Sequence, residues 1–429
     1  MRDNGLMDED QRDIDPATLS LLDPAVSECP YPAYTVLRDE APVWKDNWTG
    51  MYVVSRYEDV RAVLLDTERF PSAQHRGRVD PRSAKLRQLY RDKGWIPAPT
   101  LAARDDPEHR EMRGLFNHAF RPAKIRELDS FIESLAHRLI DQFIENERCD
   151  WVRAFAIPLP LVVIGRQMGV PEDDIWQIKA WTDAWVQRLG LMQSEEEAIW
   201  STEQEIAAQH YFQPIFERLR RRPDDSLLSD LVNTEVPEWG RTLTDEELHA
   251  EMMADTFVGG SETTTNALAE GVRLLIENPD QWEKVSSDPD TYVPLLAEEV
   301  LRLEGPVQGL FRTAAVDVEM HGVVIPAGSV VNVRYAAANR DPRHFDCPEV
   351  MDLDRENLRS HLAFGFGSHH CLGAPLARRE LILGFRALVD RVDDMWFVEG
   401  SNDFTHHPNF CLRAIKELHI GFRPRKRHS

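Results

Sequence analysis

The sequence predicts a mainly α-helical protein with small β-sheets (α+β), folded as a single large domain. Its 429 residues are 42% hydrophobic, which is ample for one extensive buried core. Apolar residues recur at helical spacing through the middle of the chain, as in residues 125–146. Short runs typical of β-strands come before and after this middle part, at 51–55 and between 318 and 335. No motif indicates a second module.

The first third of the chain mixes strands and helices. Residues 51–55 form the first predicted strand, and residues 57–65 form a helix directly after it. Residues 74–105 are rich in Arg, Pro and Gly, and we expect a long mobile segment of the kind that often carries function.

The longest predicted helix covers residues 245–277. Thr244 followed three residues later by Glu247 is a capping box, and Asn278-Pro279 ends the apolar pattern. The 33 residues would span about 50 Å, enough to cross a whole domain.

After this helix the predicted elements become short. Residues 318–320 and 323–325 flank His321-Gly322 and predict a hairpin, and a further strand follows at 329–335. A helix returns at 374–392. We expect residues 1–20 to be a flexible N-terminal tail, 21–424 the folded domain and 425–429 a basic C-terminal tail.

Composition narrows the class of protein. There are 73 acidic against 50 basic residues, a net charge of −23, which disfavours binding to nucleic acid or to an anionic membrane surface. Five widely spaced cysteines without a CxxC pair predict neither a disulfide framework nor a zinc site. No signal-like or membrane-spanning apolar run is found, so we expect a cytoplasmic protein without membrane segments.

The strongest motif is a glycine-rich loop around a cysteine, just before the last long helix. Glycines let the backbone turn tightly and let a flat ligand approach, and a helix N-terminus stabilises a thiolate. Alternatively the cysteine is a small buried apolar residue, or the Gly-x-Gly pair belongs to a nucleotide site, although the pattern does not extend to G-x-G-x-x-G. The motif positions are Phe364, Gly365, Gly367, His369, Cys371 and Gly373.

This loop resembles the cysteine-ligand loop of the cytochromes P450, Phe-x-x-Gly-x-(Arg/His)-x-Cys-x-Gly. The resemblance spans residues 30–422, and it implies the cytochrome P450 fold, with haem b (heme b, iron protoporphyrin IX) between the long central helix and the Cys-loop helix. It implies that Cys371 is the metal ligand, whose thiolate favours O–O cleavage.

A second motif interrupts the long helix at Gly259-Gly260-Ser261-Glu262-Thr263. Two glycines inside a helix cost roughly 1 kcal/mol each relative to alanine, so a widened helix beside a ligand is expected. A simple kink with surface polar residues is the alternative. The motif resembles the oxygen-activation segment of the cytochromes P450, which implies that Thr263 hydrogen-bonds dioxygen and that Glu262 helps to relay protons.

Glu299 and Arg302 share one helix face, a weak signal that other Glu-x-x-Arg pairs in the chain also show. Their place before the cysteine loop resembles the Glu-x-x-Arg helix of the cytochromes P450, which implies a structural triad with Arg355. The same resemblance implies that a set of basic residues holds the two haem propionates by charge-assisted hydrogen bonds. These residues are His109, Arg113, Arg312, His361 and His369.

The resemblance implies a monooxygenase that inserts one oxygen atom from O2 into a lipophilic small molecule: a terpenoid, steroid, fatty acyl compound or aromatic. With no flavin or iron–sulfur module in the chain, we expect electrons from a separate ferredoxin. Rival interpretations are a non-catalytic haem-binding sensor and, on the same fold, a peroxygenase or a rearrangement enzyme. A basic patch is expected to dock the ferredoxin, formed by Arg110, Arg113, Arg121, Lys124, Arg378 and Arg379.

Asp255 lies one turn before Gly259, on the helix face that carries Thr263. It either binds a substrate hydroxyl or amine, or pairs with an arginine of a neighbouring helix.

Overall fold

A computed structural model describes residues 14–73, 83–190 and 192–425. The α-helices are α1 (Pro24–Glu28), α2 (Tyr31–Glu40), α3 (Tyr57–Leu65), α5 (Ser83–Lys93), α6 (Glu108–Ala119), α7 (Pro122–Arg126), α8 (Asp129–Asp141), α9 (Pro158–Gln167), α10 (Ile175–Leu189), α11 (Glu195–Arg221), α12 (Leu227–Asn233), α13 (Asp245–Glu251), α14 (Thr263–Glu277), α15 (Pro279–Ser287), α16 (Pro289–Leu303), α17 (Tyr335–Ala338) and α18 (Ala374–Arg391). Two π-helical segments are η3 (Val152–Ala156) and η5 (Met252–Glu262). The 3-10 segments are η1 (Leu101–Ala103), η2 (Ile144–Asn146), η4 (Glu172–Asp174), η6 (Leu358–Ser360) and η7 (Gly367–His369).

The strands form three small sheets beside this helical part. Their bounds are β1 (Val43–Lys45), β2 (Tyr52–Val54), β3 (Arg148–Asp150), β4 (Leu310–Thr313), β5 (Val318–Met320), β6 (Val323–Ile325), β7 (Val330–Val333), β8 (Val392–Phe397) and β9 (His419–Pro424). The sheet orders are β1-β2-β7-β4, β3-β9-β8 and β5-β6. The mainly α fold with small sheets, predicted from the sequence, is therefore what the structure shows.

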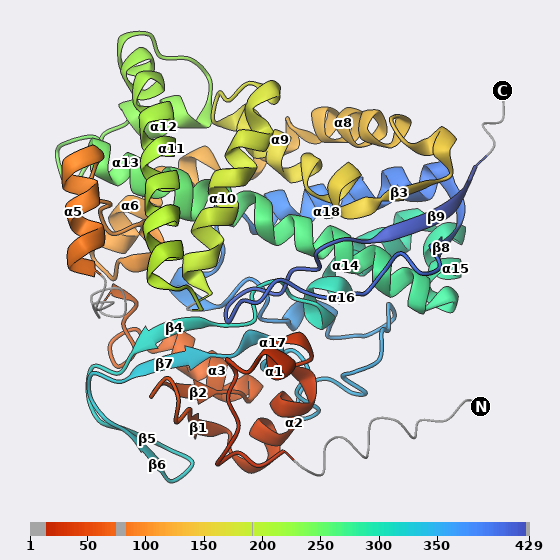
Figure 1. Ribbon diagram of the computed structural model, residues 1–429, viewed down its shortest axis with the longest axis horizontal. Helices are drawn as coiled ribbons and strands as arrows, with labels where there is room; N and C mark the ends of the chain where they lie inside the picture. Colours follow the sequence, from red (N-terminus) through yellow and green to blue (C-terminus); the bar gives the residue numbers. More distant parts are fainter. Residues whose placement is uncertain (1–13, 74–82, 191, 426–429) are drawn as a thin grey trace.

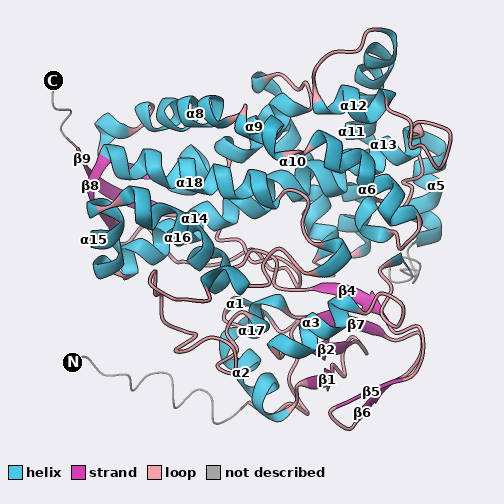
Figure 2. Cartoon of the chain, turned by 180° about the vertical axis from the view of Figure 1, so that it is seen from behind, coloured by secondary structure: helices cyan, strands magenta, loops and turns pink. Residues whose placement is uncertain are grey.

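The molecule has a helical part and a smaller part built on the four-stranded sheet (Figure 1). In that sheet β2 runs parallel to β7, although the two strands lie far apart in the sequence. The sheet lies with α1, α2, α3 and α17 below the long helices, and the view from behind shows the same division (Figure 2). Buried apolar residues form one large cluster in the helical part and two smaller ones around the sheet.

The predicted long central helix is present as three consecutive segments, α13, η5 and α14. The capping box is confirmed, because the Thr244 hydroxyl accepts from the Glu247 N–H at 3.3 Å and the Glu247 carboxylate accepts from the Thr244 N–H at 2.9 Å. The middle segment is π-helical and contains Gly259 and Gly260. The expected widening at the two glycines is therefore confirmed.

Several shorter elements can also be compared with the sequence predictions. The hairpin β5–β6 turns at His321 and Gly322, with φ angles of 51° and 76°. The helical character of residues 125–146 is confirmed, and α7, α8 and η2 divide this region. The expected loop at 74–105 contains helix α5 and segment η1, and residues 74–82 lie outside the described part of the chain.

The expected N-terminal tail is wrong for the part that the structure describes. Leu19 is 7% exposed in the cluster around the sheet, and the Trp44 indole donates to the Pro16 carbonyl at 2.8 Å. At the other end, the Arg425 N–H donates to the Arg391 carbonyl at 2.8 Å. Residues 1–13 and 426–429 lie outside the description. Of the described helices, none is long and apolar enough to cross a membrane.

Candidate functional site

The cysteine loop is held by its own backbone. Gly365 and Gly367 have φ angles of 67° and 74°, which disfavour any residue with a side chain. The Cys371 N–H donates to the Phe364 carbonyl at 2.8 Å, which closes the loop into a compact turn. A Cβ at Gly367 would lie 3.0 Å from the Leu64 carbonyl of α3. The loop therefore needs both glycines to bring Cys371 to the start of α18.

The Cys371 sulfur lies in an environment suited to a metal-bound thiolate. Burial raises the pKa of the Cys371 thiol, whereas hydrogen bonds from the Gly373 and Ala374 N–H groups and the charge of Arg113 lower it. The N–H groups that donate to the sulfur thus favour the thiolate, but by themselves they do not offset the effect of burial on the pKa. A metal cation bound to the sulfur would supply the missing stabilisation, so the residues fit an iron ligand.

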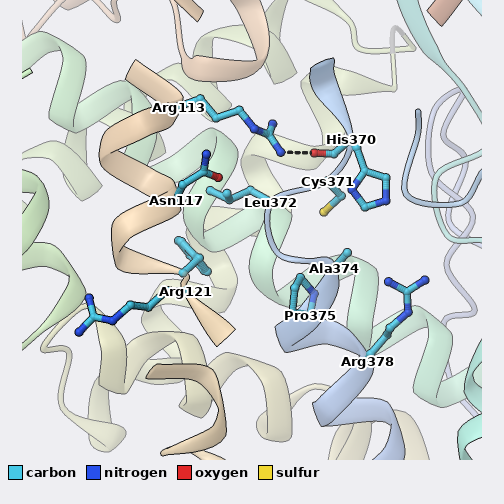
Figure 3. A pocket seen from close by; sticks show the side chains of 10 residues that line it. Arg113, Asn117, Arg121, His370, Cys371, Leu372, Ala374, Pro375 and Arg378 are labelled. Carbon is cyan, nitrogen blue, oxygen red and sulfur yellow. Dashed lines mark hydrogen bonds between the residues drawn. The ribbon is translucent and has the colours of Figure 1, made fainter. Parts of the chain in front are cut away.

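Cys371 opens into a pocket of about 400 Å³ between α6 and the start of α18 (Figure 3). Arg113 reaches across from α6 and donates to the His370 carbonyl at 2.7 Å. Leu372 lies in the same pocket, and Arg121 and Arg378 contribute further guanidinium groups to its lining. A basic pocket with an apolar centre therefore lies directly beside the sulfur.

Four of the five basic residues expected to bind propionates are brought together. The rings of His109 and His369 lie 4.1 Å apart between centroids, and the buried Nε2 atom of His109 has no hydrogen-bond partner among the described residues. Burial, followed by the charges of Arg312, His109 and Arg113, lowers the pKa of His369 to about 3. Asp105 lies 3.9 Å from His369, and Asp106 lies 3.6 Å from His109. With Arg312 and Arg113 close by, these basic side chains fit the two carboxylates of haem b.

The fifth residue, His361, does not join this group, and the expectation is corrected. Its Nε2 atom lies 3.0 Å from the Glu298 carboxylate of α16. Arg378 donates to the same carboxylate at 2.7 Å. The partner of His361 is thus a carboxylate of the protein itself, which the sequence position alone could not show.

In the central helix, the Thr263 hydroxyl donates to the Gly259 carbonyl at 3.0 Å. A Cβ at Gly260 would lie 3.2 Å from the Ile164 side chain of α9, so this glycine permits close packing. Gly259 is exposed within a mostly buried segment, and no side chain of the described residues lies within 4 Å of a Cβ built there. The two glycines thus have different roles: one faces a helix and the other an open side.

The Glu262 carboxylate has partners that the sequence analysis did not predict. The Lys179 ammonium of α10 lies 3.0 Å from both carboxylate oxygens, and the Thr182 hydroxyl donates to one of them at 2.8 Å. Lys179 also contacts Asp183, whose side chain is 50% exposed. Lys179 and Asp183 lie at i, i+4 in the sequence. Nothing in that spacing indicates that Lys179 contacts Glu262, which lies 83 positions later in the chain.

The triad implied by the resemblance is present. Glu299 and Arg302 are fully buried and form two hydrogen bonds of 2.7 and 2.8 Å. Arg355 lies 3.6 Å from the same carboxylate. This cluster joins α16 to the chain before the cysteine loop.

The expected basic patch is corrected in part. Lys124 is paired with Asp230 at 2.6 Å, and Arg379 with Asp129 at 2.7 Å, so these cations are neutralised within the protein. Arg378 is likewise held by Glu298. Arg110 is 72% exposed and lies 3.8 Å from Asp106, and Arg113 donates to the His370 carbonyl. Arg121 contacts only His118 among the described residues and is the cation of the patch that remains for a partner.

Comparisons with known proteins agree with this geometry. The family model "Cytochrome P450" matches residues 189–393. The steroid C26-monooxygenase of Mycobacterium tuberculosis is 33% identical over 393 residues, covering 91% of this chain and 93% of the relative. The polyketide biosynthesis cytochrome P450 PksS of Bacillus subtilis is 32% identical and covers 86% and 88%.

Solved structures share the whole fold. The P450BioI complex with an acyl carrier protein that carries hexadec-9Z-enoic acid has a TM-score of 0.83 at 30% identity, covering 92% of this chain and 99% of that one. An intact type IV self-sufficient cytochrome P450 monooxygenase has a TM-score of 0.86 at 30% identity, covering 96% of this chain and 52% of that one. With its cysteine loop, its widened central helix and relatives that match along nine-tenths of its length, this chain belongs to the cytochrome P450 family.

Proposed function

We propose that this cytochrome P450 monooxygenase inserts one oxygen atom from O2 into a lipophilic small molecule, with Cys371 as the iron ligand. The family uses thiolate-ligated haem b, and relatives are named for steroid, polyketide and biotin pathways. The observation that carries the proposal is the Cys371 sulfur, which faces a pocket and accepts from two N–H groups at the start of α18.

The residues around the sulfur have separate tasks. His109, Arg113, Arg312 and His369 would hold the haem carboxylates, and the N–H groups of the loop stabilise the thiolate. Bound there, the haem supplies the oxidising chemistry of the reaction.

Protons reach the open side of the central helix along a chain of side chains. Asp183 is accessible from solvent, Lys179 touches both Asp183 and Glu262, and Glu262 directly precedes Thr263. Lys179 holds the Glu262 carboxylate, and the Gly259 carbonyl holds the Thr263 hydroxyl. Ordered donors of this kind are what a reaction that consumes protons at a dry site requires. This feature favours the monooxygenase over a sensor or a peroxygenase, which do not need a proton chain.

The decisive experiment is a reduced carbon monoxide difference spectrum of the wild type and of Cys371→Ser. The wild type should show the thiolate-type spectrum, and the serine variant should lose it while it keeps its helical circular dichroism. An unchanged thiolate-type spectrum in a folded Cys371→Ser protein rejects the ligand. Oxygen consumption without any product from a panel of steroids, fatty acyl compounds and aromatics rejects the lipophilic substrate class.

The electron donor is proposed to be a separate ferredoxin that docks at the pocket beside Cys371. Arg121 lines this pocket and contacts only His118 among the described residues, so an acidic partner would be steered to it. Arg121→Glu should slow reduction by ferredoxin about tenfold at low salt. The control is Arg221→Glu on α11, whose side chain is 77% exposed outside the pocket lining. Equal rates for the two variants would place the docking surface elsewhere.

A further inference from the structure

Segment η5 has one open face in an otherwise buried helix. Asp255, Gly259 and Thr263 are accessible at intervals of four residues, while residues 252–254, 256–258 and 261–262 are buried. Helices α9 and α10 pack against η5. Residues four apart share a helix face, so Asp255 lies on the side that presents the Thr263 hydroxyl.

The Asp255 carboxylate is oriented by the chain segment beside it. Its Oδ2 atom accepts from the Ala102 N–H at 3.0 Å. One turn earlier, the Glu251 carboxylate accepts from the Leu101 N–H at 2.6 Å. The two acids therefore hold the start of η1 against the central helix, and one Asp255 oxygen is committed to this task.

The expected arginine partner of Asp255 is not seen. Across residues 14–73, 83–190 and 192–425, the ion pairs of the structure include no lysine, arginine or histidine within 4 Å of this carboxylate. By contrast, Glu247, two turns before on the same helix, is paired with both Arg104 and Arg241. Among the described residues, Asp255 thus has no cationic partner on the open face, whereas Glu247 has two.

We propose that Asp255 is a specificity-determining residue that binds the cationic group of a lipophilic substrate, most favourably a protonated or quaternary amine. A carboxylate without a cationic partner attracts a cation, accepts a hydrogen bond from a hydroxyl more weakly and repels another carboxylate. Eight residues separate Asp255 from Thr263, about 10–12 Å along the helix. The substrate charge would therefore lie about that far from the oxidised carbon. This inference rests on the proposed monooxygenase function and adds a substrate class to it.

The test compares three ligands that differ only in the head group: decyltrimethylammonium, decanol and decanoate. The quaternary amine cannot coordinate iron, so its binding reports the Asp255 environment alone. Calorimetry on the haem-loaded protein gives dissociation constants without relying on turnover. We expect decyltrimethylammonium to bind about tenfold more tightly than decanoate, with decanol between them. Tighter binding of decanoate than of decyltrimethylammonium overturns the proposal.

Asp255→Asn removes the charge and keeps an oxygen that can accept from the Ala102 N–H. It should bring the affinities for the cation and the anion to within about threefold, with decanol unchanged. Glu251→Gln is the matched control, since it removes one charge from an acid that supports the same segment but is fully buried. It should retain the tenfold preference. A preference that persists in Asp255→Asn, or that disappears equally in both variants, rejects Asp255 as its source.

The two hypotheses fail in different ways. A protein without a thiolate-type carbon monoxide spectrum refutes the proposed function, whatever its charge preference. A protein with that spectrum and no preference for the cation refutes only the role of Asp255. If Asp255→Asn does not fold, the three-ligand comparison on the wild type still decides.

Discussion

Removing the charge of Glu299 tests whether the buried triad stabilises the molecule. Both Glu299 and Arg302 are fully buried, and the Arg302 guanidinium also donates to the carbonyls of Asn339, Pro348 and Val350 at 3.0, 2.7 and 3.2 Å. In Glu299→Gln this guanidinium stays buried without its counter-ion. Breaking a buried pair on one side typically costs about 3–5 kcal/mol.

The expected change in melting temperature follows from the size of the chain. With about 2.1 cal/mol/K of unfolding entropy per residue, the chain has an unfolding entropy of about 0.9 kcal/mol/K, and the loss corresponds to about 3–6 °C. Thermal unfolding at one scan rate, followed by circular dichroism on the haem-loaded protein, measures this shift.

Glu58→Gln provides the matched control for this experiment. Glu58 and Arg61 have the same Glu-x-x-Arg spacing, but they lie 3.6 Å apart with side chains 71% and 42% exposed. Such a surface pair contributes about 0–1 kcal/mol, so its melting temperature should move by no more than about 1 °C. If the two variants melt within a degree of each other, burial is not what gives the triad its importance.

Three further predictions concern the site and its surroundings. Lys179→Gln deprives the Glu262 carboxylate of its cation, so product formation should fall about tenfold while substrate affinity stays constant; an unchanged rate and an unchanged solvent isotope effect would remove Lys179 from the proton path. Burial raises the pKa of Glu380 to about 8, so this carboxyl favours the folded state below its ordinary pKa of 4.5, and that contribution is lost as the pH rises through 8. Glu380→Gln, which does not titrate, should therefore melt with a weaker pH dependence between about 5 and 9 than the wild type, which loses on the order of 4 kcal/mol over that range; parallel curves would contradict this. Gly367→Ala places a side chain at a φ of 74° and should cost about 1–2 kcal/mol, measured as lower haem retention on heating, whereas Gly114→Ala, at an open helical position, should not.

Sequence reasoning succeeded where a feature depends on neighbouring residues. The capping box of Thr244 and Glu247 and the turn at His321-Gly322 are determined by local backbone geometry, and both are present. The widening at Gly259-Gly260 was also predicted, because two adjacent glycines inside a helix need a reason.

The sequence predictions were wrong where a side chain has more than one possible partner in the folded protein. His361 was expected to face a haem propionate, but Glu298 of α16 holds it. Arg378 was expected to be free for a redox partner, and the same carboxylate takes it. Each of these contacts depends on how two segments are rotated relative to each other. The spacing of residues within either segment does not indicate that rotation.

The sequence by itself therefore determined the elements and the chemistry of the cysteine loop, because a contiguous motif carries its own geometry. Only the tertiary structure decided which charged side chains are paired: Lys179 contacts Glu262, whereas Asp255, on the open face of η5, has no cationic partner in the described part of the chain. The physical reason is that an ion pair forms over a few ångströms in space, a distance that depends on the packing of whole helices and not on the order of residues along the chain.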